Sequence, residues 1–491
     1  MYDKTAALGA IDQVIAQGPY EPSWESLSTW EPPKWYRNAK FGIFIHWGVY
    51  AVPAFGSEWY PRSMYIQGSK EYQHHIATYG PHKDFGYKDF IPLFKAEQFD
   101  SAAWAQLFHQ AGARYVVPVA EHHDGFQMYK SELSHWNAAE MGPKRDVLGQ
   151  LKEAVEAEGM VLGASSHRIE HWFFMSHGKD FDSDIPQEPD RDHLYWPSMP
   201  DSENWDDIAG QPGPSQEFLE DWLVRTCELI DRYQPRVLYF DWWIHHVNAK
   251  PYLKKLAAYY YNRAAQWGVE VAIDYKHDAY LFGAGVPDIE RGQMADIKPY
   301  FWQTDTAIAL NSWCYTENND FRDPEGILCD LCDIVSKNGA LLLNVGPKAD
   351  GTFSEEDRAV LTAIGSWMRV NGEAIYDTRV WKTFGEGPTQ VRDGHFSDSV
   401  KKNFTPEDFR FTAKGSTLYA IALKAAEDGA YCVRSLRMQE HTAGTVFHGV
   451  VKGVEVLGAS QPPQWTRDGE GLHISTDYRA QGPVTFKIQL D

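Results

Sequence analysis

Hydrophobic and polar positions alternate regularly over residues 40–347. Short apolar runs rich in β-branched and aromatic residues alternate with segments in which apolar residues recur every three or four positions. This pattern predicts consecutive β-α units and therefore a parallel sheet. Several of the runs are apolar throughout, which is typical of strands covered on both faces. The predicted strands are 41–46, 115–120, 160–165, 237–241, 269–274 and 340–345.

The segments between these strands carry helix start signals. Asp100 and Asp146 each precede an apolar stripe with helical spacing, and their carboxylates can accept hydrogen bonds from the first turn. A third helix is expected from near Ser215, and a capping box is expected to begin at Ser354. Strands and helices together predict a (β/α)8-like, TIM-type barrel over residues 1–380.

Beyond residue 380 the pattern changes. The chain becomes rich in turns, and its apolar residues alternate with polar ones in short segments such as 417–423 and 484–490. Because no convincing helical pattern interrupts these segments, residues 381–491 are expected to form a smaller all-β domain, a β-sandwich. The stretch 384–404 is rich in glycine and polar residues and is predicted to be a loop.

Composition limits the partners and the location of the protein. The 491 residues exceed what one hydrophobic core usually supports, which favours more than one domain. The mean hydropathy is -0.48, and no segment approaches the roughly 20 apolar residues that cross a bilayer. A net charge of -22 argues against nucleic acid, since phosphate contacts need clustered cations. The amino terminus has neither a basic leader nor an apolar run, so a cytoplasmic location is predicted; a trimmed secreted form would look the same. A homo-oligomer is left open.

The five cysteines do not form a disulfide framework, because their number is odd and their positions are scattered. Cys329 and Cys332 have the C-x-x-C spacing of some metal sites. They lie, however, in a segment whose apolar residues recur with helical spacing, and no second pair follows. Buried thiols in a helix are therefore predicted.

Polar residues cluster where four of the predicted strands end. In parallel β/α folds, functional sites form at the carboxyl ends of the strands, so these residues are expected to share one pocket. The first strand is also followed closely by Glu58 and Trp59. The residues at or just after the four strand ends are His46; Glu121, His122 and His123; His167 and Glu170; and Asp241, Trp242 and Trp243.

The histidines can serve either a polar ligand or a metal. One buried histidine is usually satisfied by the backbone, but His46, His122 and His123 at one rim would converge on the same volume. Binding of a metal ion is the alternative role for these histidines. The H-E-x-x-H spacing of zinc hydrolases is absent, and the adjacent His122 and His123 would point to opposite sides of an extended backbone. The sequence thus predicts no metal and no cofactor.

Two carboxyl groups are candidates for the chemistry. Asp241 emerges from an apolar strand beside two tryptophans, a setting that suits a nucleophile with a fixed orientation better than it suits a helix cap. Its partner would be a carboxyl group that stays protonated, and Glu290 is the choice. In an extended segment Asp288 and Glu290 share a face, whereas Arg291 points away. Glu58, Glu121 and Glu170 compete for the same role.

Taken together, these segments resemble glycoside hydrolase family 29, the α-L-fucosidases. The matches occur in the expected order over most of residues 35–380, and they become looser beyond that point. The matching motifs are WYRNAKFGIFIHWGVYAVPAFGSEWY (35–60), EHHDGF (121–126), YFDWW (239–243), PDIERG (287–292), WQTDT with SWCY (302–315), VSKNGALLLNVGPKADGTF (335–353) and NGEAIY (371–376).

The resemblance implies an exo-acting α-L-fucosidase that retains configuration, with Asp241 as nucleophile and Glu290 as acid/base. It implies a fucosylated oligosaccharide or glycoconjugate as substrate, together with an appended β-sandwich. Side chains at His46, Glu58, Trp59, His122 and His123 match positions that hold the fucose hydroxyls, and Trp313 matches an aromatic residue near the deoxy methyl group.

Two departures from the family pattern stand out. His167 ends the third strand where many relatives carry an aromatic residue, and Cys314 stands where glycine is usual. His167 is nevertheless predicted to contact the sugar. The alternative functions are action on an α-L-galactoside, transfer of fucose, a silent fucose-binding protein and a metal-dependent hydrolase.

Overall fold

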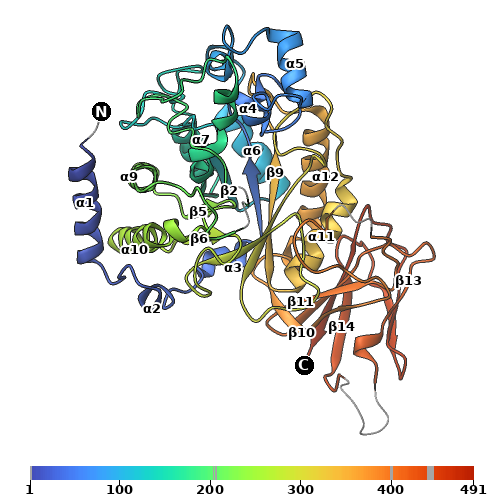
Figure 1. Ribbon diagram of the computed structural model, residues 1–491. Helices are drawn as coiled ribbons and strands as arrows, with labels where there is room; N and C mark the ends of the chain where they lie inside the picture. Colours follow the sequence, from blue (N-terminus) through green and yellow to red (C-terminus); the bar gives the residue numbers. More distant parts are fainter. Residues whose placement is uncertain (1–2, 203, 205–206, 399–401, 439–446) are drawn as a thin grey trace.

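The computed structural model describes residues 3–202, 204, 207–398, 402–438 and 447–491 (Figure 1). Its larger part is a closed parallel barrel, because β1 pairs with both β9 and β2. β3 and β4 share one position beside β2, which gives eight positions around the barrel. The strands are β1 (Phe41–Ile45), β2 (Tyr115–Glu121), β3 (Val161–Leu162), β4 (Ala164–Ser166), β5 (Val237–Phe240), β6 (Ala272–Tyr275), β7 (Val286–Glu290), β8 (Trp302–Ala307) and β9 (Gly339–Val345).

The predicted barrel is confirmed, but the sequence pattern missed β7 and β8. Both strands carry polar residues on their buried positions: Asp288 and Glu290 in β7, and Gln303 and Asp305 in β8. A search for apolar runs does not detect such strands. The predicted strand 269–274 was also placed too early, since β6 begins at Ala272.

The helix start signals are confirmed. The carboxylates of Asp100 and Asp146 each accept a backbone N–H of the first turn at 3.0 Å. Ser215 and Ser354 cap their helices in the same way. The helices are α1 (Lys4–Gln17), α2 (Trp24–Leu27), α3 (Lys34–Ala39), α4 (Tyr60–Ser63), α5 (Lys70–Tyr79), α6 (Ser101–Ala111), α7 (Val147–Ala157), α8 (His171–Phe174), α9 (Gln216–Tyr233), α10 (Lys250–Trp267), α11 (Pro324–Ser336) and α12 (Glu355–Asn371).

The C-terminal part consists of two antiparallel sheets around a second core, as predicted for an all-β domain. One sheet has the order β10-β11-β12-β17-β14 and the other β13-β16-β15. The boundary predicted at residues 380 and 381 lies within β10. The strands are β10 (Arg379–Glu386), β11 (Phe409–Lys414), β12 (Thr417–Ala422), β13 (Ala430–Val433), β14 (Val451–Val456), β15 (Gln464–Arg467), β16 (Leu472–Ser475) and β17 (Val484–Leu490).

Helix α11 lies between the barrel and the C-terminal sheets (Figure 1). Its buried Asp333 pairs with Arg410 of β11, and the Cys329 thiol donates to the carbonyl of Leu423 at 3.3 Å. Cys329 and Cys332 are both free and buried, as predicted for core thiols. The helix therefore connects the two parts through polar as well as apolar contacts.

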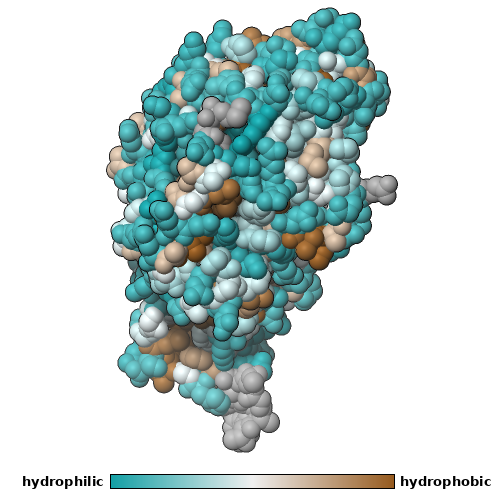
Figure 2. Space-filling model, turned by 60° about the vertical axis from the view of Figure 1, so that its left-hand side comes forward, coloured by the Kyte–Doolittle hydropathy of each residue, from teal (hydrophilic) through white to brown (hydrophobic). Residues whose placement is uncertain are grey.

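The face of the molecule in Figure 2 is mostly polar. In Figure 2 the hydrophobic patches are small and separated by hydrophilic residues, which is ordinary for a folded protein. Among the residues that the structure describes, no helix combines the length and apolar character needed to cross a bilayer.

Candidate active site

The predicted residues meet in one cavity at the carboxyl ends of the barrel strands. The cavity has a volume of about 200 Å³. Trp242 and Trp243, which the sequence places at this rim, also line the cavity, whereas sequence reasoning missed four further lining residues, Phe44, Tyr239, Asp305 and Phe396. All nine predicted residues line it: His46, Glu58, Trp59, His122, His123, His167, Asp241, Glu290 and Trp313.

Strand ends place these side chains. His46 directly follows β1, Asp241 directly follows β5, and Glu290 is the last residue of β7. The expectation that His122 and His123 point to opposite sides is wrong. Because β2 ends at Glu121 and the chain then turns, both rings line the cavity, with centroids 4.1 Å apart.

Asp241 is held by a hydrogen-bonded histidine. His167 Nδ1 lies 3.1 Å from Asp241 Oδ2, and the Ser165 hydroxyl lies 2.9 Å from His167 Nε2. If the hydroxyl donates to Nε2, the proton of the neutral ring is on Nδ1 and points at the carboxylate. Burial alone would raise the pKa of Asp241, but His167 and the Lys276 ammonium hold that pKa well below its usual value. Asp241 is therefore an anion at neutral pH.

Glu290 has the opposite character. Burial raises the pKa of its carboxyl group from 4.5 to about 7, with help from the negative charges of Asp305 and Asp241, whereas the Lys276 ammonium opposes the rise. The indole N–H of Trp242 donates to Glu290 Oε2. One carboxyl group that stays ionised and another that holds its proton near neutrality can work as a nucleophile and a general acid.

Lys276 links the two carboxyl groups. Its buried ammonium lies 2.7 Å from Glu290 Oε2 and 3.9 Å from Asp241 Oδ1. It also lies 3.1 Å from Asp305, and these carboxylates raise the pKa of Lys276 well above its usual value despite burial. Lys276 follows β6, so the strand-end reasoning that found Asp241 could have found it.

The remaining histidines are neutral. Burial lowers the pKa of His46, His122 and His123; neighbouring imidazoles add to the lowering at His46 and His122, whereas at His123 the Asp241 carboxylate opposes it. His46 Nδ1 lies 2.7 Å from Asn344 Oδ1, which leaves Nε2 for a ligand. Neutral imidazoles can donate or accept hydrogen bonds, so they suit sugar hydroxyls.

Glu58 and Trp313 support each other in the wall of the cavity. Glu58 Oε2 accepts the backbone N–H of Trp313 at 3.0 Å and faces the Ser312 hydroxyl at 3.3 Å. The Trp313 ring packs between His46 and the guanidinium of Arg291. The indole of Trp313 therefore lines the cavity beside the Glu58 carboxylate.

Two competing acids are buried and are not among the residues that line the cavity. Glu121 lies 2.7 Å from Arg168 and 3.4 Å from Arg225, in an ion-pair network that includes Asp221. Glu170 is fully buried, and burial raises its pKa well above its usual value. Its Oε2 is 2.9 Å from His123 Nδ1, although that nitrogen's hydrogen bond goes to the carbonyl of His167.

A metal would have to compete with the protein for its ligands. One ring nitrogen from each of His46, His122 and His167 lies within 4.8 Å of the others, which is close enough for an ion. Both nitrogens of His167, however, already face Ser165 and Asp241 at hydrogen-bonding distance. This arrangement favours a polar ligand over a metal.

A barrel that holds two carboxyl groups of opposite pKa shift in an aromatic cavity defines a glycoside hydrolase. Known proteins identify the family. The profile described as Alpha-L-fucosidase matches residues 7–373, and the chain belongs to the α-L-fucosidase family. This confirms the resemblance in the sequence and the α-L-fucosidase activity that it implies.

Individual relatives agree with this assignment. The plasma alpha-L-fucosidase of Homo sapiens is 30% identical, over 91% of this chain and 86% of that protein. The human tissue alpha-L-fucosidase is 30% identical over 95% and 91% of the two chains. The structure is similar to that of Thermotoga maritima alpha-fucosidase in complex with fucose, with a TM-score of 0.73 and 28% identity over 96% and 100% of the chains.

Proposed function

We propose that this chain is an exo-acting, retaining α-L-fucosidase in which Asp241 is the nucleophile and Glu290 the acid/base. The distances from Lys276 to the two carboxyl groups carry the proposal. Because these distances are 3.9 and 2.7 Å, Asp241 Oδ1 and Glu290 Oε2 are at most about 6.6 Å apart. This limit is compatible with the separation of about 5 to 5.5 Å in retaining glycosidases, and it leaves out most of the range of about 6.5 to 9.5 Å that inverting enzymes need.

The reaction proceeds in two displacements. Asp241 attacks the anomeric carbon while protonated Glu290 donates its proton to the glycosidic oxygen, so the leaving group departs as a neutral alcohol. The resulting fucosyl ester is then attacked by water, from which the Glu290 carboxylate takes a proton. Two inversions restore the α configuration, and Glu290 regains the proton needed for the next cycle.

The cavity fits one small terminal sugar. Neutral imidazoles and the Glu58 carboxylate supply hydrogen bonds to hydroxyl groups, and the indole of Trp313 supplies an apolar surface for the methyl group of a 6-deoxy sugar. Because a solved relative binds fucose, we infer a fucosylated oligosaccharide or glycoconjugate as substrate. The proposed sugar contacts are His46, Glu58, Trp59, His122, His123, His167 and Trp313.

Asp241→Ala tests the proposal. On an aryl α-L-fucoside the variant should lose at least about 10³-fold in rate. Azide should restore part of the rate and form β-fucosyl azide, because a single displacement by an external nucleophile inverts the α-linkage. Asp182→Ala is the control, since this exposed aspartate pairs with exposed Lys83. Full activity of Asp241→Ala, or rescue that gives the α-azide, would refute the assignment.

A further inference from the structure

One aromatic side chain at the active site is exposed. Phe396 lines the catalytic cavity, yet 57% of its surface is accessible to solvent. It comes from the stretch predicted as a loop after β10, far in the sequence from the other lining residues. An exposed phenyl ring gains little from burial, so its position calls for another explanation.

The segment 393–398 that carries Phe396 is attached to the chain that follows β7. The backbone N–H groups of Gly394, Phe396 and Asp398 donate to carbonyl groups of residues 290–293 at 2.8, 2.9 and 2.9 Å. The contact is close: a Cβ atom at Gly292 would lie 2.1 Å from the Gly394 carbonyl oxygen, so only glycine fits there.

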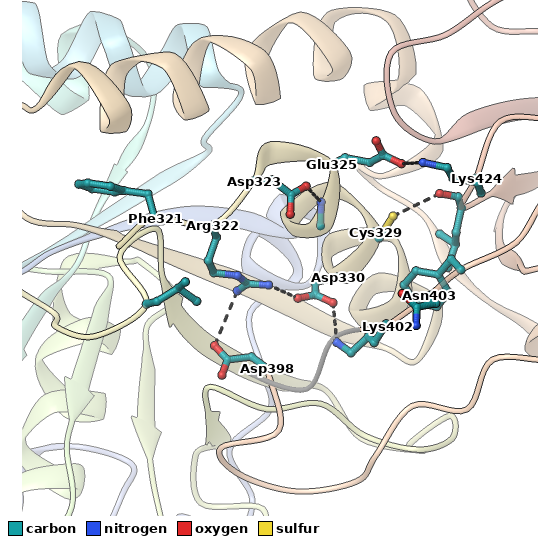
Figure 3. A pocket seen from close by; sticks show the side chains of 14 residues that line it. Phe321, Arg322, Asp323, Glu325, Cys329, Asp330, Asp398, Lys402, Asn403 and Lys424 are labelled. Carbon is teal, nitrogen blue, oxygen red and sulfur yellow. Dashed lines mark hydrogen bonds and ion pairs between the residues drawn. The ribbon is translucent and has the colours of Figure 1, made fainter. Parts of the chain in front are cut away.

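Side chains fix both ends of the same segment. The backbone N–H of Glu290 donates to His395 Nδ1 at 2.9 Å. The carboxylate of Asp398 accepts a hydrogen bond from the Thr306 hydroxyl at 2.6 Å and lies 3.7 Å from Arg322. Asp398 and Arg322 line a second cavity, which is larger than the catalytic one (Figure 3). Phe396 is therefore held in place although its ring is exposed.

The backbone of Phe396 is strained. Its φ of 53° lies in the left-handed region, which is unfavourable for a residue with a side chain. Strain of this kind persists where the surroundings impose it, and it is common at ligand sites. Glycine would relieve the strain, but it would remove the ring.

The ring belongs to an aromatic pair that contacts Glu290, the assigned acid/base. Phe396 stacks on Trp242, with centroids 6.0 Å apart and planes 12° from parallel. The indole N–H of Trp242 in turn donates to Glu290. Since Glu290 must reach the glycosidic oxygen, the group attached to that oxygen passes beside this aromatic pair.

We propose that Trp242 and Phe396 form the binding surface for the sugar ring to which the fucose is attached. The flat C–H face of a pyranose packs on aromatic rings, and a purely polar surface would not provide this apolar contact. This inference rests on the proposed function and adds a specificity-determining residue, Phe396, to it.

Two substrates separate leaving-group binding from catalysis. Methyl α-L-fucoside and an α-L-fucosyl hexose disaccharide both release an alcohol as the leaving group, so both need the proton of Glu290. Only the disaccharide offers a second ring. Phe396→Ala should lower kcat/KM about 5- to 15-fold on the disaccharide and less than about 2-fold on the methyl fucoside. Inhibition by free fucose should be unchanged, and Phe396→Trp should keep the disaccharide activity.

Phe282→Ala is the matched control, because Phe282 is 59% exposed and lines a different cavity. Equal losses on both substrates would mean that the segment only positions Glu290, and no loss on either substrate would mean that the ring binds nothing; either result overturns the inference. The proposed function fails separately, if the wild-type protein releases fucose from methyl α-L-fucoside with inversion.

Discussion

Replacing Glu290 with glutamine should separate substrates by their leaving groups. The amide keeps the shape of the side chain, and its oxygen can still accept the indole N–H of Trp242. It cannot donate an acidic proton to the glycosidic oxygen. Substrates whose leaving group is an alcohol should therefore form the fucosyl ester more slowly, whereas an activated aryl fucoside should form it at a nearly normal rate.

The expected size of the effect follows from the protonation state of Glu290. With a pKa of about 7, the carboxyl group is mostly protonated at pH 6. A positioned general acid contributes about 10²- to 10⁴-fold, or roughly 3 to 5.5 kcal/mol of the barrier. We expect Glu290→Gln to lose that factor in kcat/KM on a disaccharide. On the activated substrate kcat should fall instead, because water attack on the ester still needs the base.

The pH profile gives an independent check. Glu290 must be protonated to act as an acid, so wild-type kcat/KM on an alcohol leaving group should fall as the pH rises through about 7. Glu290→Gln should lack this limb. Glu58→Gln is the control, since Glu58 lines the same cavity and its loss should weaken all substrates alike. A uniform loss across leaving groups in Glu290→Gln, or a persisting limb near pH 7, would refute the assignment.

Three further predictions concern other parts of the barrel. His167→Phe removes the N–H that faces Asp241, so kcat/KM at pH 7 should fall about 10- to 100-fold. Ser165→Ala should lower kcat/KM less, and equal losses in the two variants would contradict the role of the His167 ring. Dialysis against EDTA should leave activity unchanged, and a loss that zinc restores would establish the metal alternative. Asp221→Asn should lower the free energy of unfolding by about 3 kcal/mol, because Arg168 and Arg225 would lose one of the two buried carboxylates that they share. The pKa of Asp221 is lowered, so in urea titrations this difference should shrink below pH 3.8, and a difference independent of pH would count against the ion pairs.

The barrel was predictable where its strands are apolar on both faces. β7 and β8 were missed because their inward positions hold Asp288, Glu290, Gln303 and Asp305. These carboxyl groups are tolerated in the interior because they face the ammonium of Lys276 or the Gln303 amide. A search for apolar runs misses these strands because of their polar network. The same network shifts the pKa of Asp241 and of Glu290.

The site was predictable where a functional residue directly follows a recognised strand, as His46 and Asp241 do. Phe396 could not be found in this way. Its position depends on hydrogen bonds between segments about a hundred residues apart, and local sequence does not encode such contacts. The domain boundary near residue 380, the cytoplasmic location and a homo-oligomer stay predictions.

The central claim is that Asp241 forms a covalent bond with the sugar. The central test is incubation with 2-deoxy-2-fluoro-α-L-fucosyl fluoride. The fluorine at C2 of this reagent slows both displacements but slows the second more, so the ester should accumulate. Mass spectrometry of the digested protein should then find one fluorofucosyl group, on the peptide that contains Asp241. A label on another residue would contradict the account, and so would a protein that turns the reagent over with inversion and without any label.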